Sequence, residues 1–352
     1  MKPKNRKIYM DFLRIAACFW VVFNHQPGYL AYQSSTHALS TFGYMFFTMV
    51  TRINVPIFFM LTGALLLPKE TTYKELFSER ILRMASVLVI FSFTFYIVTN
   101  KSNLGGISLL DFLRKLIAGD HQSAYWYLYA YLGFLLTLPF MQRIAHRFTR
   151  EDFLLIIAVH CIISTVLPIA NHIIHYYSAF STIQYSDDFR VPLMTTKAFF
   201  YPLIGYYLEH VFDIDRLRKK HLFCLLALSC LGIGVSSLLT YQQGIASSFT
   251  QNYVQVFDYV LAINFYITVK YFFTNCHKLN NLEFISFISS LTFGIYLMDP
   301  ILRRCGKHIF FDAIIPKSYP LFYSFSWCLF SMTVGGFITY LLKKLPWFNK
   351  LL

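Results

Sequence analysis

The chain has 352 residues, of which 56% are hydrophobic, 19% aromatic and only 14% charged, and its mean hydropathy is +0.50. This composition excludes an ordinary soluble domain, in which roughly a quarter of the residues are charged. The net charge of +14 would suit a nucleic-acid-binding protein, but in so apolar a chain basic residues first indicate one side of a membrane.

Apolar stretches of spanning length follow one another along the whole chain, since about 20 apolar residues cross the hydrocarbon core. The predicted spans are 8–30, 42–67, 84–99, 124–142, 153–171, 191–208, 222–240, 254–273, 284–302 and 319–342. Their connections are polar or marked by Pro and Gly, and none is long enough to separate two domains. The sequence therefore predicts one domain over residues 1–352, an all-α polytopic membrane protein of about ten transmembrane helices. Any chemistry must belong to the bundle itself.

The distribution of Lys and Arg over the connections predicts the orientation of the bundle. With the N-terminus inside, the inner segments hold 20 basic residues and the outer loops hold 8. Short cytoplasmic loops carry such an excess, so both termini are expected to be cytoplasmic in a multi-pass protein of the cell (cytoplasmic) membrane. One outer connection departs from the rule, because it holds Arg303, Arg304, Lys307 and Lys317. Either this loop has an electrostatic role or a late span is misplaced.

Neither a metal site nor a disulfide framework is predicted. The seven cysteines are scattered, with no Cys-x-x-Cys pair. His172 and His175 have a spacing that could bind metal, but no carboxylate or cysteine lies nearby in the sequence, and a membrane-interface role is favoured. The basic start and apolar run of the N-terminus resemble a signal peptide, yet Asp11 and Arg14 interrupt the run and indicate a retained first helix.

Three ionisable residues lie on one face of the first predicted helix. Arg14 and His25 are separated by about three helical turns, or about 16 Å along the axis, and Asp11 stands one turn before Arg14. Ionisable residues inside a span indicate function because they are costly in hydrocarbon. Arg14 could hold a phosphate and His25 could exchange protons, an arrangement suited to a long anionic ligand such as an acyl-CoA. The alternative is that Asp11 and Arg14 mark the interface and that His25 is a buried histidine of the bundle.

The pattern Asp11-x-Leu13-Arg14, with His25 after ten further residues, resembles the Arg-x10-His signature of the integral-membrane acyltransferase-3 family. The segment RINVPIFFMLTG at 52–63 is similar to an Arg-x-x-Val-Pro-Leu-Phe-Phe-x-x-Ser-Gly block of that family's surface-polysaccharide O-acyltransferase branch. Two departures stand out. The family often has His at the position of Asp299, and it has His-x-Trp where this chain has Ala124 before Tyr125 and Trp126.

The resemblance implies a ten-helix membrane enzyme that moves an acyl group, commonly acetyl, from cytosolic acyl-CoA to a hydroxyl of a cell-envelope or lipid-linked glycan. Acetyl-CoA is then the expected co-substrate, and membrane lipid and the glycan are the expected partners, with no nucleic acid and no metal. His25 matches the catalytic histidine and Arg14 its partner. Arg52 and Arg83 match other basic positions.

The candidate site residues follow from these patterns together. His25 is expected to act as the general base or as a transient acyl carrier, with Arg14 beside it and Asp11 orienting Arg14. The donor phosphates are expected to bind Arg14, Arg52, Arg80 and Arg83, although Arg80 and Arg83 are equally typical of a positive inner loop. Acceptor contacts are expected from Trp126, Tyr129 and Asp299. The aromatic pair could instead belong to an interfacial belt, and Asp299 could pair with Arg303, four residues on.

Other kinds of function share part of this pattern. A polysaccharide exporter or flippase, or a proton-coupled transporter, would also be a polytopic bundle with internal Arg, His and Asp. A transport pathway should place such charges near the midplane on several facing helices, whereas here they follow one helix inward from its basic end. The stripe on the first helix therefore favours the enzyme. A catalytically silent family member acting as a membrane partner is the third alternative.

Overall fold

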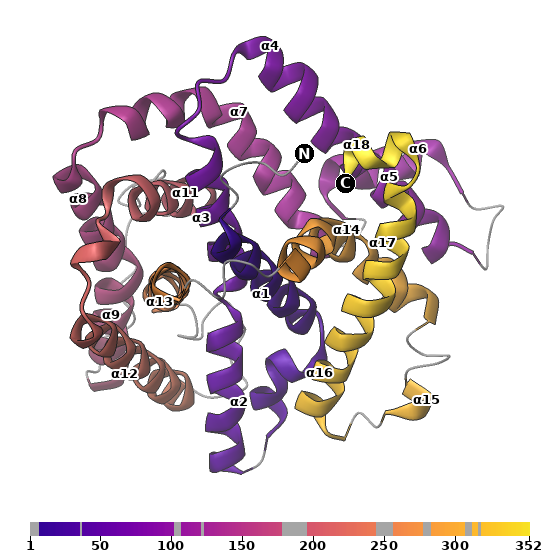
Figure 1. The fold of residues 1–352 in the computed structure, drawn as a ribbon. Helices are drawn as coiled ribbons and strands as arrows, with labels where there is room; N and C mark the ends of the chain where they lie inside the picture. Colours follow the sequence, from indigo (N-terminus) through magenta and orange to yellow (C-terminus); the bar gives the residue numbers. More distant parts are fainter. Residues whose placement is uncertain are drawn as a thin grey trace.

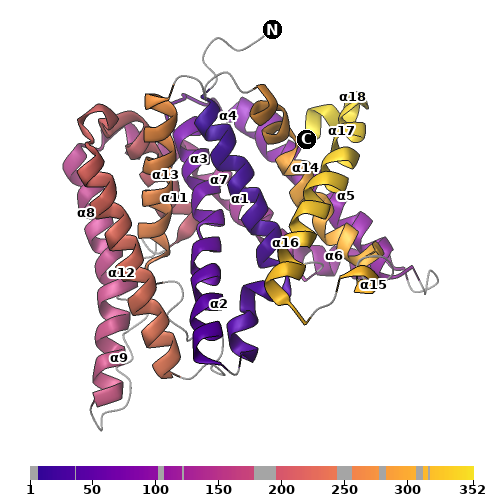
Figure 2. The same cartoon turned by 60° about the horizontal axis from the view of Figure 1, so that its bottom comes forward.

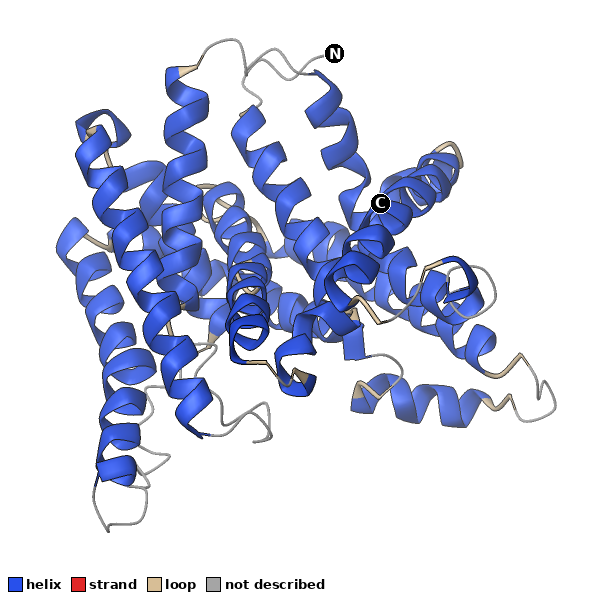
Figure 3. Ribbon diagram, turned by 90° about the horizontal axis from the view of Figure 1, so that it is seen from below, coloured by secondary structure: helices blue, strands red, loops and turns tan. Residues whose placement is uncertain are grey.

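The computed structural model describes residues 7–35, 37–101, 107–120, 123–177, 196–243, 256–276, 283–306, 312–315 and 318–352. Within these ranges all regular structure is helical and no strand occurs (Figures 1 and 3). The α-helices are α1 (Ile8–Asn24), α2 (Ala38–Thr51), α3 (Asn54–Leu66), α4 (Tyr73–Glu75), α5 (Leu82–Thr99), α6 (Leu109–Ala118), α7 (Trp126–Arg147), α8 (Arg150–Cys161), α9 (Leu167–Tyr177), α11 (Lys197–Tyr206), α12 (Lys219–Gln243), α13 (Asp258–Asn275), α14 (Glu283–Gly306), α15 (Asp312–Ile314), α16 (Pro320–Phe330), α17 (Gly336–Lys343) and α18 (Pro346–Leu351).

Several of these helices continue one another through single turns of π-helix. Such turns join α4 to α5, α8 to α9 and α16 to α17, and a 3₁₀ segment, η1 (Pro27–Ser34), follows α1. Six continuous segments of the described chain are long and apolar enough to cross a membrane: Ala38–Leu66, Tyr73–Thr99, Arg150–Ile174, Lys219–Gln242, Glu283–Gly306 and Pro320–Lys343. The prediction of an all-helical, multi-pass membrane protein is confirmed at this level.

The four remaining predicted spans also coincide with helix, in α1, α7, α11 and α13. Residues 191–195 and 254–255 of those spans lie outside the described residues. The start of α1 and the C-terminal α18 lie at the same end of the bundle (Figure 2). This end is called the terminal end below. The count of ten spans and the cytoplasmic location of both termini stay predictions.

Helix α1 runs through the centre of the bundle, where α3, α13, α14 and α16 pack around it (Figure 1). Its residues Leu13, Ala17 and Val22 are completely or almost completely buried. Asp11 of the charged stripe is buried as well, as expected for an ionisable group that packs against protein at membrane depth.

The first predicted span is not one continuous helix, because α1 ends at Asn24. Pro27 has no N–H to donate to the carbonyl of Phe23 and disfavours a helical conformation at Gln26, which is extended. The amides of His25 and Gln26 instead close tight turns onto the carbonyls of Val22 and Phe23, at 3.2 and 2.9 Å. His25 is thus held at a helix end, beside a change in chain direction.

The second predicted span is interrupted between α2 and α3, although Arg52 and Ile53 keep right-handed helical backbone angles and the segment Ala38–Leu66 stays continuous. Pro56 cannot donate to the carbonyl of Arg52, four residues earlier, and the amide of Val55 is bonded to the Asn54 side chain at 2.6 Å. The carbonyl of Thr51 therefore does not accept the usual helical hydrogen bond from the Val55 amide. It accepts one from Asn24 Nδ2 instead, at 3.4 Å. The two helix breaks lie next to each other, which places Arg52 near the end of α1.

Two glycines allow α3 and α11 to approach closely. A Cβ atom on Gly63 would lie 1.9 Å from the carbonyl oxygen of Pro202, and one on Gly205 would lie 1.9 Å from that of Met60. Small residues permit such backbone contact between membrane helices. The pair α3–α11 therefore forms a rigid wall beside α1.

Helix α6 lies outside the predicted spans and shows how local sequence sets its ends. The Ser108 hydroxyl caps its start by accepting the Asp111 amide at 3.4 Å, and Gly119, at φ 75°, ends it. Asp111 also pairs with Lys115 at 2.8 Å, one turn on. Hydrogen bonds from Lys115 and Tyr96 lower the pKa of the Asp111 carboxyl.

Candidate active site

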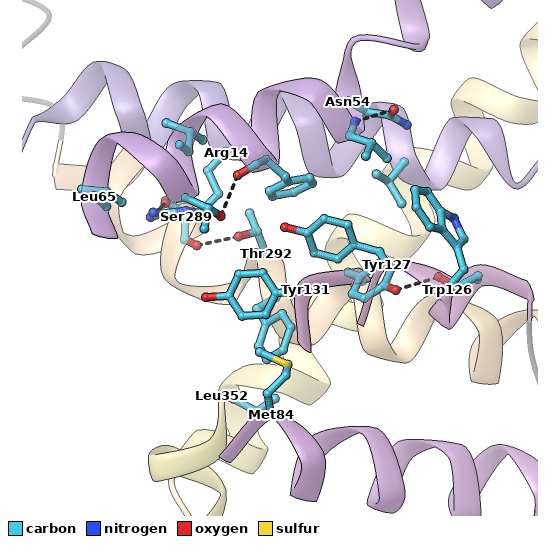
Figure 4. A pocket seen from close by; sticks show the side chains of 18 of the residues that line it. Arg14, Asn54, Leu65, Met84, Trp126, Tyr127, Tyr131, Ser289, Thr292 and Leu352 are labelled. Atoms are coloured by element: carbon cyan, nitrogen blue, oxygen red, sulfur yellow. Dashed lines mark hydrogen bonds between the residues drawn. The ribbon is translucent and has the colours of Figure 1, made fainter. Parts of the chain in front are cut away.

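A cavity of about 1040 Å³ opens beside α1, and both Arg14 and His25 line it. Its walls come from α1, α3, α5, α7 and α14 together with the chain's C-terminal residues. Figure 4 shows Arg14 and Ser289 toward one end of the cavity and Trp126 toward the other, with Tyr127 between them. The face of α1 that the sequence marks with charge is thus the face that borders the cavity.

One end of the cavity is strongly basic. Four cations line it: Arg14, Arg80, Arg83 and Lys343. Arg83 Nε donates to the carbonyl of Leu351 at 3.0 Å, and Lys343 Nζ donates to that of Ser290 at 3.1 Å, so the C-terminal helices α17 and α18 contribute to this end. Tyr131 lies within electrostatic range of three of these cations. Glu79 is the one acidic residue among the described residues that line the cavity.

Asp11 holds Arg14 in place from behind the cavity wall. The Asp11 carboxylate is 2% exposed and accepts hydrogen bonds from the hydroxyls of Ser286 at 2.9 Å and Ser289 at 2.7 Å, both on α14. Arg14 Nη1 lies 3.3 Å from both Asp11 Oδ1 and Ser289 Oγ. The predicted Asp11–Arg14 pair is therefore present, and it leaves the guanidinium facing the cavity.

His25 faces the cavity from the end of α1 and is paired with Asp299 of α14. His25 Nδ1 lies 2.9 Å from Asp299 Oδ2, and the carboxylate is completely buried. Because an ionised carboxylate only accepts hydrogen bonds, the neutral imidazole that fits this contact carries its proton on Nδ1 and has its lone pair on Nε2. A histidine in this state can act as a general base or as a nucleophile.

Two further donors and one cation hold Asp299. Trp327 Nε1 donates to Oδ1 at 2.8 Å and Ser331 Oγ donates to the same oxygen at 3.1 Å, both from the α16 side. Arg303 Nε lies 3.3 Å from Oδ2, as the sequence predicted for residues four apart on a helix. Arg303 Nη1 also donates to the backbone carbonyl of His25 at 3.2 Å. One guanidinium thus fixes both members of the His25–Asp299 pair.

These contacts explain part of the unexpected charge in the last outer connection. Helix α14 continues to Gly306, so Arg303 and Arg304 belong to a helix and not to a loop. Arg303 has the electrostatic role that the sequence left open. Lys307 and Lys317 lie outside the described residues.

Arg52 and Lys197 line the cavity apart from the basic end. The Arg52 guanidinium is 5.5 Å from the ring centre of Tyr29, four residues beyond His25, although the sequence grouped Arg52 with Arg80 and Arg83. Lys197 Nζ lies 3.3 Å from Asp258 Oδ2, whose other oxygen accepts a bond from the Tyr201 hydroxyl at 3.0 Å. The structure thus pairs Lys197 with Asp258, two polar residues of separate predicted spans.

The structure separates the two predicted acceptor aromatics. Trp126 is half exposed and lines the cavity, whereas the hydroxyl of Tyr129 donates to the carbonyl of Leu116 at 2.6 Å, and Tyr129 is not part of the described cavity wall. Tyr127 and Tyr131 line it instead. Their spacing of four residues puts both on one face of α7, a signal that the sequence contained.

Two further histidines, His160 and His172, are not among the described residues that line the cavity. His160 stacks on Phe200 with ring centres 3.7 Å apart, and His172 Nε2 lies 3.2 Å from Gln242 Oε1. The side chain of His175 is outside the described residues. Among the residues that the structure describes, no group of three His, Cys, Asp or Glu side chains could hold a metal ion.

Comparison with protein families finds a model described as an acyltransferase domain, which matches residues 7–341. The match extends from the start of α1 into α17 and so includes the two helices that carry the His25–Asp299 pair. No curated protein and no solved structure matches the chain.

Proposed function

The chain belongs to the acyltransferase-3 family and is a membrane acyltransferase, and from this premise we propose that it transfers an acetyl group from cytosolic acetyl-CoA to a hydroxyl of a cell-envelope or lipid-linked glycan. One observation carries the proposal. A single cavity is lined at one end by four cations and farther along by a histidine whose Nδ1 is held by a buried carboxylate. An acyl-CoA matches this arrangement, because its phosphates lie at one end of the molecule, where the cations would bind them, and its thioester lies at the end of a long arm that could reach the histidine.

The donor binds with its phosphates at the terminal end. Arg14, Arg80, Arg83 and Lys343 hold the phosphates, and the arm follows Tyr131 and Tyr127 toward His25. Arginine suits phosphate because its planar guanidinium can donate two parallel hydrogen bonds. The distance from Arg14 to His25, about 16 Å along α1, separates the phosphates from the reacting carbonyl. The excess of Lys and Arg in the inner segments supports a cytoplasmic location for this end, in the cell membrane.

Transfer at His25 can follow one of two balanced routes. In the first, Nε2 removes the proton of the glycan hydroxyl, the hydroxyl oxygen attacks the thioester carbonyl, the C–S bond breaks, and coenzyme A leaves as a thiol with that proton. In the second, Nε2 attacks the carbonyl and the C–S bond breaks, so that coenzyme A leaves as a thiolate; the glycan hydroxyl oxygen then attacks the acyl-imidazolium, the C–N bond breaks, the hydroxyl proton goes to the thiolate, and the imidazole is neutral again. Asp299 has the same task in both routes, because it keeps the Nδ1 proton in place and stabilises the imidazolium or acyl-imidazolium.

The test supplies isotopically labelled acetyl-CoA to membranes that contain the protein and an envelope glycan acceptor. Label should reach the glycan with the wild type and fall to background with His25→Ala and Arg14→Ala. Matched controls are His146→Ala, an exposed histidine of α7, and Arg216→Ala, an exposed arginine paired with Asp213 three residues earlier. Undiminished transfer by His25→Ala, or none by the wild type on a suitable acceptor, would refute the proposal.

The two routes differ in what remains on the protein when the acceptor is absent. Labelled acetyl-CoA is mixed with purified protein and the reaction is quenched in denaturant. An acyl-imidazole would give protein-bound label that hydroxylamine releases and that His25→Ala lacks. A general-base route gives no such label, although the same preparation transfers the acetyl group once the glycan is added.

A further inference from the structure

Helix α6 carries four large apolar side chains that project from the described protein: Leu109, Leu110, Leu113 and Ile117. Leu110 is 78% exposed and Ile117 is 85% exposed. At about 100° per residue, the four side chains lie within an arc of about 100° around the helix. A contiguous apolar face of this kind is unfavourable in water and marks contact with a membrane or with another protein.

The rest of the circumference of α6 is divided between a packed face and a charged face. On the packed face, the ring of Phe112 meets that of Phe93 on α5, with ring centres 5.1 Å apart. The charged face occupies a separate arc and consists of Asp111, Arg114 and Lys115. A helix that separates an apolar face from a charged one typically lies in the plane of a membrane interface, with its apolar face toward the acyl chains and its charged face toward water.

The position of α6 relative to α5 places it where a membrane surface is expected. Helix α5 belongs to the segment Tyr73–Thr99, which is long and apolar enough to cross a membrane. Arg83, in the first turn of α5, is bonded to Leu351 at the terminal end. Tyr96, in the last turn of α5, donates its hydroxyl to the Asp111 carboxylate of α6 at 3.0 Å. Helix α6 therefore lies at the end of a spanning helix that is opposite the terminal end.

The exposed apolar surface of α5 continues onto α6, and the two helices lie side by side (Figures 1 and 2). Val89, Phe93 and Ile97 of α5 are all exposed, and their spacing of four residues puts them on one face. In a spanning helix such a face meets the acyl chains of the lipid. Because Phe93 is also the residue that contacts Phe112, the apolar face of α6 adjoins a surface that already faces lipid.

We propose that α6 is an interfacial helix, whose apolar face is inserted into the lipid leaflet that lies away from the terminal end and whose charged face remains at the headgroups. The partner of this surface is the lipid itself. The Tyr129 hydroxyl donates to the Leu116 carbonyl at 2.6 Å, and Tyr129 follows Trp126 by about one turn of α7. The inserted helix is thus fixed to the part of α7 that carries Trp126, and the Trp126 end of the cavity lies near the level of the headgroups.

The first test compares two thiols on opposite faces of α6. Arg114→Cys and Ile117→Cys are prepared in the full chain and reconstituted into phosphatidylcholine vesicles, with a water-soluble maleimide on both sides of the membrane. The thiol at residue 117 should react about tenfold or more slowly than the one at residue 114, because the reactive thiolate does not form in an apolar environment. Mass spectrometry of the peptide that carries α6 separates these thiols from the seven native cysteines, which lie elsewhere in the chain. In denaturant the two thiols should react at equal rates.

The second test identifies what covers the apolar face. A photoreactive benzoyl-phenylalanine takes the place of Ile117 in one variant and of Arg114 in the matched control, again in phosphatidylcholine vesicles. Irradiation should add the mass of one phospholipid to the variant at residue 117 and leave the control at residue 114 without this adduct. Both side chains are exposed, so neither substitution disturbs the packed face; a wild-type unfolding temperature checks this.

Each outcome decides the inference. Slow labelling of the thiol at residue 117 together with a lipid adduct supports it. Equal labelling of the two thiols in vesicles overturns it, because both faces of α6 would then lie in water. A covalent dimer in place of the lipid adduct also overturns it, because a second copy of the chain would then cover the face, and so does the absence of any adduct at residue 117. Since neither test measures acetyl transfer, the proposed function stands or falls separately.

Discussion

Asp299→Asn is the substitution that most directly tests the proposed chemistry. In the wild type Oδ2 accepts from His25 Nδ1 at 2.9 Å and forms an ion pair with Arg303 Nε at 3.3 Å. An asparagine of the same shape can keep Oδ1 as the acceptor for Trp327 and Ser331. Its NH₂ group then takes the place of Oδ2 and faces His25 Nδ1 and the Arg303 guanidinium, which carry protons of their own. His25 Nδ1 must then accept a hydrogen bond from the amide, so the neutral imidazole carries its proton on Nε2. It thereby loses the lone pair that faces the cavity.

The expected loss follows from this change of tautomer. General-base catalysis by a positioned histidine contributes about 10²- to 10⁴-fold, which corresponds to about 3–5 kcal/mol of transition-state stabilisation. Asp299→Asn should therefore lower kcat for labelled acetyl transfer by that factor and leave the KM for acetyl-CoA within about threefold, because Arg14 and the other phosphate-binding residues are untouched. Ser331→Ala removes one neutral donor to Oδ1 and keeps the charge, so it should cost about tenfold or less.

The assay measures initial rates of label transfer over a range of acetyl-CoA concentrations, with thermal unfolding in detergent as the control for folding. A folded Asp299→Asn protein with a wild-type kcat would refute the assignment of His25 as base or acyl carrier held by Asp299. A selective rise in the KM for the glycan, with kcat unchanged, would instead return Asp299 to the acceptor-binding role predicted from the sequence.

Asp11→Asn should raise the KM for acetyl-CoA about tenfold with little change in kcat, because a charged partner of Arg14 is lost while the histidine is untouched; saturation curves check this, and an effect confined to kcat would contradict it. Lys343→Gln should weaken acetyl-CoA binding about three- to tenfold and flatten its salt dependence, measured by calorimetry at two salt concentrations; an unchanged salt slope would exclude a phosphate contact. Gly63→Ala should destabilise the bundle by about 1–3 kcal/mol or more, because its Cβ meets the backbone of α11. Gly43→Ala is the control, since nothing lies within 4 Å of its Cβ; equal unfolding temperatures would show that α3 and α11 can separate freely.

The local geometry of the chain could be predicted from the sequence. The periodicity of a helix is independent of its neighbours, so the spacing of Asp11, Arg14 and His25 was enough to place them on one face. The break at Arg52 follows from Pro56, whose missing N–H removes a specific hydrogen bond. The composition was enough to predict a membrane bundle, because apolar segments of this length are stable as helices in the hydrocarbon core of a membrane.

Contacts between segments that are distant along the chain could not be predicted from the sequence. His25 and Asp299 are 274 residues apart, and nothing in the spacing of either residue indicates the other. Sequence analysis placed Asp299 either with the acceptor or in a pair with Arg303, and it placed Arg52 with the donor; the pair with Arg303 is present. Their actual neighbours, His25 in one case and Tyr29 in the other, depend on how α1, α2 and α14 pack.

The composition and charge pattern of this chain determined a helical membrane protein with a charged stripe on its first helix, because solvation and helical repeat act along the chain. The tertiary structure alone decided what the stripe faces. Packing of α14 against α1 supplies the carboxylate for His25 and the serines for Asp11, and the C-terminal helices bring Lys343 to the basic end of the cavity. Such contacts arise from the joint packing of many side chains, and single-residue patterns do not encode them.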